Sequence, residues 1–117
     1  FNYKNSSKPL QQFIDLHECA HHQTGDVGLP NPPRNSPDHM INESIADCIA
    51  TLRIRDEITG GEDVVLQAVE QLIKAMTKMG FHQSTTVSRM SNILNCLNKE
   101  NSAEFSLKGI LRHRGLK

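Results

Sequence analysis

The sequence predicts a mainly α-helical domain. Apolar residues recur every three or four positions through most of the chain, which is the period of an amphipathic helix. No stretch alternates apolar and polar residues convincingly enough to predict a strand. At 117 residues the chain fits one domain with a single core. We therefore expect residues 1–117 to form one helical domain, with any substrate-binding β-strands minimal or missing from this chain.

The first helix is expected from about residue 8 to residue 22 or 23. Ser6 or Ser7 can accept hydrogen bonds at its start, and Pro9 suits its first turn. Its inward face follows at spacings of three and four: Leu10, Phe13, Ile14, His17 and His21. The next segment, Thr24 to Pro37, holds two glycines and four of the five prolines. This composition predicts a loop rather than a regular element.

A second helix is expected from about Asp38 to Glu57, ended by Gly60 and Gly61. Its inward stripe is Ile41, Ile45, Ile49 and Leu52. Glu62 and Asp63 favour the start of a third helix that stops at Gly80, because acidic groups stabilise helix N-termini. The third helix should bury Val65, Val69, Leu72, Met76 and Met79.

Two more helices complete the predicted domain. Ser84 or Thr85 can open a fourth helix. Its inward residues are Val87, Met90, Ile93, Leu94 and Leu97. A short fifth helix could bury Phe105, Leu107, Ile110 and Leu111.

Charge and hydropathy exclude several classes of partner. Thirteen Lys and Arg balance thirteen Asp and Glu without a long like-charge run, so we expect no nucleic-acid partner. No apolar run reaches the roughly 18 residues that span a bilayer, and the first residues lack the apolar core of a signal peptide. We expect a soluble protein. Because the chain begins with Phe1 rather than Met, upstream residues can be missing, and the compartment and the oligomeric state stay open.

The most informative motif is H-E-x-x-H at His17-Glu18-Cys19-Ala20-His21. Residues four apart lie on one face of a helix, so the imidazoles of His17 and His21 can converge on one metal ion. Glu18 would then stand beside the open position of that ion. This is the layout of a zinc hydrolase, in which Zn²⁺ acidifies a water and a carboxylate accepts its proton.

A second acidic pair, Glu43 and Asp47, lies one helical turn apart on the second predicted helix. A catalytic zinc keeps three protein ligands and one open position, so we predict Glu43 as the third ligand. Asp47 would accept the remaining ring N–H of a liganding histidine, with His17 as the expected partner. The alternative is an acidic pair favoured only by the helix dipole.

The other cysteine and histidine residues near the motif are not expected to bind the metal. Cys19 lies two residues from each motif histidine, which turns it away from the metal face. In an exported protein, a Cys19–Cys48 disulfide could tie the two metal-bearing helices together. His22 points about 100° away from His21, and His39 lies at the junction of loop and helix. We expect His22 to lie at the surface or beside the metal ligands without coordinating the ion, and His39 to be a surface residue.

These residues resemble the gluzincin class of zinc metallopeptidases. H-E-C-A-H-H followed by N-E-S-I-A-D-C-I-A is similar to the H-E-x-x-H and E-x-x-A-D pairing of HtpX-type peptidases and their small soluble relatives, over about residues 10–55. The resemblance implies a zincin-like helical core around the metal site. It also implies roles that agree with those above: His17, His21 and Glu43 as ligands, Glu18 as general base and Asp47 as support.

A second resemblance to these families extends from Gly80 to Ile93. It looks like their H-P…R-I segment, and it implies that His82 and Arg89 assist the oxyanion or orient substrate. Gln83 replaces the proline, and the spacing from His82 to Arg89 is one residue longer than usual. Gluzincins usually bind peptide as an added strand, yet only nine residues precede Leu10. Repressor-cleaving proteases of the ImmA type are a second family reading, although they usually carry A-N where this chain has A-D.

The function predicted from the sequence is zinc-dependent hydrolysis of a peptide or protein substrate, by an endopeptidase with Glu18 as general base. Both ends of the predicted loop, Thr24 to Pro37, are anchored beside the zinc site, so we expect it to limit which substrates enter. The rival reading is a non-catalytic helical interaction domain in which zinc, or no metal, staples two helices.

Overall fold

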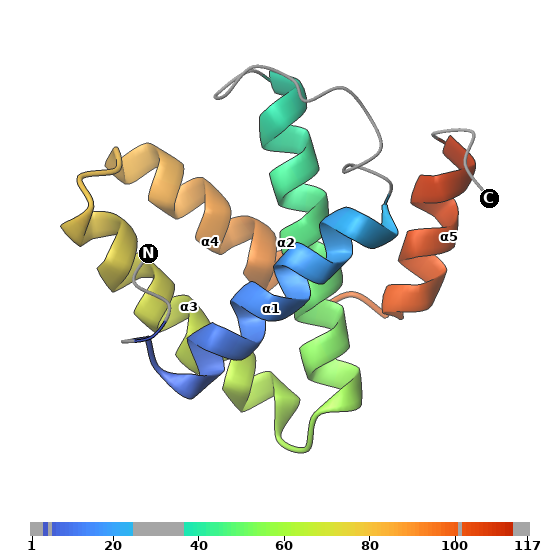
Figure 1. The fold of residues 1–117 in the computed structure, drawn as a ribbon, viewed down its shortest axis with the longest axis horizontal. Helices are drawn as coiled ribbons and strands as arrows, with labels where there is room; N and C mark the ends of the chain where they lie inside the picture. The colour runs from blue at the N-terminus through green and yellow to red at the C-terminus, as the bar shows by residue number, and fades with distance from the viewer. Residues whose placement is uncertain (1–3, 5, 25–36, 101, 114–117) are drawn as a thin grey trace.

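The computed structural model describes Lys4 and residues 6–24, 37–100 and 102–113. These residues form five helices and no strand: α1 (Lys8–Gln23), α2 (Pro37–Glu57), α3 (Gly61–Lys78), α4 (Gln83–Leu97) and α5 (Ala103–His113) (Figure 1). The mainly α-helical class is thereby confirmed for this part of the chain. The predicted loop lies outside the described residues, apart from Thr24 and Pro37. The structure therefore does not bear on its expected effect on substrate entry.

Helix ends follow local signals in the sequence. Ser7 caps α1, because its Oγ accepts a hydrogen bond from the backbone N–H of Leu10 at 3.4 Å. Gly60 joins α2 to α3 with a φ of 69°, a left-handed conformation that glycine adopts without strain. A Cβ atom on Gly61 would lie 1.9 Å from the carbonyl oxygen of Ile54, so a side chain has no room where the two helices meet.

Helix α2 runs through the middle of the molecule and contacts each of the other four helices (Figure 1). The larger apolar core includes residues from α1 to α4: Leu10, Phe13, Ala50, Ile54, Val65, Leu72, Met76 and Ile93. A smaller cluster extends from α1 and α2 to α5: Ala20, Ala46, Ile49, Leu52 and Ala103. Because α2 belongs to both clusters, its orientation against α1 is fixed by apolar packing on two sides.

Four residues predicted to face inward are instead exposed: Ile41, Met79, Val87 and Phe105. Each lies close to a helix end. Periodicity identifies the apolar face of a helix, but it does not say how far the neighbouring helices continue along that face.

A disulfide joins Cys48 of α2 to Cys96 of α4, with the two Cα atoms 5.5 Å apart. Cys19 is free and exposed. The alternative pairing of Cys19 with Cys48 was therefore wrong, because Cys19 lies on the outer face of α1 while Cys48 faces α4. Within the described residues, every helix is too short or too polar to span a membrane.

Candidate metal centre

Helix α1 directs two histidines, one turn apart, toward α2. His17 is buried, with 6% of its surface exposed, and His21 is partly buried. Their Nε2 atoms lie 3.2 Å apart, and the two rings meet edge to face at an interplanar angle of 81°. The four-residue spacing of the motif thus brings one nitrogen of each ring to a common point.

Glu43 of α2 completes a group of three side chains around that point. Its Oε2 lies 2.8 Å from Nε2 of His17, and its Oε1 lies 3.3 Å from Nε2 of His21. We call these three residues the ligand group, because one ligand atom from each lies within 4.8 Å of the others. Tetrahedral ligands at zinc bond lengths of about 2.0–2.1 Å lie about 3.3 Å apart. The donor types suit zinc, and two of the three spacings are close to this value, whereas the His17–Glu43 spacing of 2.8 Å is that of a hydrogen bond.

Asp47, one turn after Glu43 on α2, contacts the other nitrogen of His17. Its Oδ1 lies 2.7 Å from Nδ1 of His17, and the residue is 1% exposed. A neutral imidazole that donates Nδ1–H to this carboxylate keeps its lone pair on Nε2, the nitrogen that faces Glu43 and His21. When His17 is neutral, Asp47 thus favours the tautomer that a metal ligand requires.

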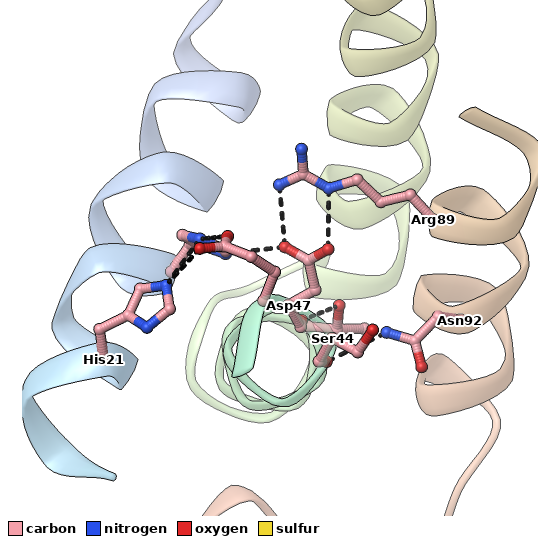
Figure 2. Close-up of polar contacts among 8 residues, drawn as sticks. His21, Ser44, Asp47, Arg89 and Asn92 are labelled. Atoms are coloured by element: carbon pink, nitrogen blue, oxygen red, sulfur yellow. Dashed lines mark hydrogen bonds and ion pairs between the residues drawn. The ribbon is translucent and has the colours of Figure 1, made fainter. Parts of the chain in front are cut away.

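Arg89 of α4 contacts both oxygens of the Asp47 carboxylate (Figure 2). The Nε atom of Arg89 donates to Oδ2 at 2.8 Å, and Nη2 donates to Oδ1 at 3.0 Å. This is a bidentate ion pair with a buried carboxylate. Three helices therefore contribute to one polar network, which consists of His17, His21, Glu43, Asp47 and Arg89.

The polar network shifts the protonation equilibria of its members. Burial works against the charged form of His17, but hydrogen bonds to Asp47 and Glu43 outweigh it and raise the pKa of His17 to about 9. Hydrogen bonds from His17 and His21 hold the pKa of Glu43 well below its usual range. Burial also disfavours the Arg89 cation, yet the ion pair with Asp47 raises the pKa of Arg89 above its ordinary value. Without a metal, His17 is therefore protonated at neutral pH.

The other residues singled out in the sequence lie outside this network. Glu18 follows His17 directly and is exposed, as are Cys19 and His22. The side chain of His39 is outside the described residues. His82 caps α4, where its Nδ1 accepts the backbone N–H of Ser84 at 3.1 Å and lies 2.7 Å from the hydroxyl of the same residue. The structure does not bring His82 to the ligand group.

Two features of the site were missing from the sequence interpretation. The ion pair of Arg89 with Asp47 joins residues that are 42 positions apart, and the Cys48–Cys96 disulfide joins residues 48 apart. Arg89 had been singled out only through the resemblance, and with a role toward substrate or the oxyanion. No helical periodicity links residues on different helices, so local spacing carries no signal for either contact.

The chain matches no protein-family model, and searches of curated proteins and of solved structures found no match either. The gluzincin resemblance therefore rests on the motif residues alone.

Proposed function

We propose that this protein is a zinc-dependent peptide hydrolase. The observation that supports this proposal is the convergence of His17, His21 and Glu43, whose donor atoms are 2.8–3.3 Å apart. Two imidazoles and one carboxylate are a donor set typical of catalytic zinc, which keeps a fourth position for water or substrate. Among the described residues, the ligand group has these three members, as an open catalytic site requires.

Each side chain has a distinct role in this proposal. The ligand group would hold zinc, and a bound zinc ion supplies the Lewis acidity that makes water a nucleophile at neutral pH. Glu18, exposed and adjacent to His17 in α1, would accept a proton as water adds to the carbonyl carbon and would donate it to the amine as the C–N bond breaks. Asp47 holds His17 in the liganding tautomer.

The proposal is tested by replacing Glu18 with Gln. Loss of the proton acceptor should lower the rate of peptide hydrolysis by about 10²–10⁴-fold, while the ligand group still binds one zinc per chain. Zinc is measured by elemental analysis, and hydrolysis with a library of quenched fluorescent peptides. Glu62→Gln, an exposed change of the same type in the first turn of α3, is the matched control and should leave both values unchanged. Full activity in Glu18→Gln would remove Glu18 from the mechanism.

The metal ligands are tested separately. His17→Ala and Glu43→Ala should each abolish stoichiometric zinc binding, because two remaining donors hold zinc weakly. Full zinc retention in Glu43→Ala would remove Glu43 from the ligand set.

One observation favours a second candidate, a non-catalytic helical interaction domain. Without an ion, protonated His17 and Arg89 already place two positive charges opposite the carboxylates of Glu43 and Asp47. The network alone can therefore staple α1, α2 and α4 together. A parent protein that binds no zinc and cleaves no peptide would favour this staple over the hydrolase.

A further inference from the structure

The carboxylate of Asp47 is held in a single orientation by Arg89. The terminal torsion of an aspartate is broad, so a carboxylate bound at one point can rotate. Arg89 instead donates to both oxygens, at 2.8 and 3.0 Å, and its planar fork fixes the plane of the carboxylate. The same Oδ1 atom that accepts from Arg89 lies 2.7 Å from Nδ1 of His17. The orientation of Asp47 thus determines where the His17 ring is held.

Arg89 also supplies a permanent positive charge beside Asp47. A guanidinium stays protonated in proteins, and Arg89 forms an ion pair with the Asp47 carboxylate. Asp47 is 1% exposed, and a buried carboxylate without such a partner is strongly unfavourable. Arg89 therefore stabilises the buried carboxylate that contacts His17.

Two further links hold the helix that carries Arg89. The side-chain amide of Asn92, one turn after Arg89, donates to the carbonyl oxygen of Ser44 at 3.1 Å (Figure 2). One turn later, Cys96 is bonded to Cys48 of α2. The backbone of α4 is thus attached to α2 beside the Arg89–Asp47 pair, so the guanidinium is presented from a fixed position.

We infer that Arg89 is a positioning residue of the metal centre: it orients Asp47, Asp47 orients His17, and Arg89 itself contacts neither metal nor substrate. The inference rests on the proposed function to the extent that the ligand group binds zinc. It assigns Arg89 a different role from the one that the gluzincin resemblance implies, which is a contact with substrate or the oxyanion. The two roles differ in whether zinc affinity depends on Arg89.

Two substitutions of Arg89 test the inference in the full chain. Arg89→Gln removes both the charge and the fork, and it should weaken zinc affinity by about tenfold or more, within the range usual for groups that support metal ligands. Arg89→Lys keeps the charge but loses the fork, so its loss should be smaller. Zinc affinity is measured by competition with a chelating indicator. The visible absorption of Co²⁺ bound in place of zinc reports ligand geometry, and it should shift most in Arg89→Gln.

Arg55→Gln is the matched control. Arg55 also pairs with an aspartate, Asp56, and also links α2 to the end of α4, since it donates to the carbonyl oxygens of Leu97 and Lys99. It lies two turns beyond Asp47 on α2, and its hydrogen bonds to Asp56, Leu97 and Lys99 are made to groups outside the polar network. Its loss should change the stability of the fold without changing zinc affinity or the Co²⁺ spectrum.

A double-mutant cycle separates the two possible roles of Arg89. If Arg89 acts through Asp47, then Arg89→Gln should cost little further zinc affinity in a chain that already carries Asp47→Asn. If Arg89 contacts substrate, Arg89→Gln should raise KM while zinc affinity and the Co²⁺ spectrum stay at parent values, and this result would overturn the inference.

The remaining outcomes separate the inference from the proposed function. Peptidase activity with unchanged zinc affinity in Arg89→Gln overturns the inference alone. A parent that binds zinc but cleaves no peptide overturns the hydrolase proposal alone, and the zinc measurements still support or reject the role of Arg89. A parent that binds no zinc overturns both.

Discussion

Helices α1 and α4 lie on either side of α2 and meet it in different ways (Figure 2). The α1 side brings two imidazoles against Glu43, groups that gain and lose protons. The α4 side brings a disulfide and a bidentate arginine–aspartate pair. The comparison shows two kinds of interface: the α1 side joins titratable side chains, and the α4 side is held by a covalent bond and an ion pair.

Removal of the disulfide should have the largest effect on stability and tests the α4 side. A bond that closes a loop of 48 residues contributes about 4 kcal/mol in the chain-entropy model, so the Cys48→Ser/Cys96→Ser variant should unfold more easily by that amount. The measurement is urea unfolding without reductant. Treatment of the parent with a dithiol reductant should reproduce the loss. Equal stability of parent and variant would show that the two cysteines are not bonded in solution.

The α1 side should respond to pH. His17 has a pKa of about 9 in the folded, metal-free protein and about 6.5 when unfolded, so the fold favours its protonated form. This contribution is fully present below pH 6.5 and is lost as pH rises to about 9. The unfolding free energy of the metal-free protein should therefore fall by up to about 3 kcal/mol over that window. His17→Gln should remove this dependence, and a flat profile in the parent would contradict it.

Zinc competes with the same proton, so its affinity should follow pH in the opposite direction. An ordinary histidine would release its proton near pH 6.5, and zinc affinity would stop rising above that value. Because the polar network holds the proton of His17 more tightly, zinc affinity should keep rising up to about pH 9. Calorimetry in buffers of different ionisation enthalpy would count the protons released. A plateau near pH 6.5 would show that His17 is neutral before zinc binds.

The sequence predicted features that depend on residues close together in the chain better than it predicted contacts between helices. The convergence of His17 and His21 needs only the four-residue period of one helix, and Ser7 and Gly60 mark helix ends through their own chemistry. The partner of Asp47 on α4 is a matter of tertiary packing. Arg89 is 42 residues away, and nothing in its local sequence specifies which face of α2 it meets. The composition of the ligand group was therefore accessible to sequence reasoning, while the support of that group was only partly so.

The smallest expected effect concerns Cys19, which lies between the two histidines of the motif. It is two residues from each, so its side chain is about 200° around the helix from theirs, and it is exposed. Cys19→Ser should change the unfolding free energy by no more than about 0.5 kcal/mol and leave zinc affinity at the parent value. Cys48→Ser/Cys96→Ser makes the same Cys→Ser change on the other side of α2. The difference in unfolding free energy between the two variants therefore separates the effect of the disulfide from that of the substitution itself.

Thiol titration of the native protein provides a second measure of the same contrast. An exposed thiol should react with a disulfide reagent, whereas Cys48 and Cys96 should stay unreactive until the protein is reduced. Zinc should not protect Cys19, since its sulfur faces away from the ligand group. If Cys19→Ser lost zinc binding, or if zinc protected the Cys19 thiol of the parent, α1 would present a different face to α2. The sulfur of Cys19 would then be a metal ligand.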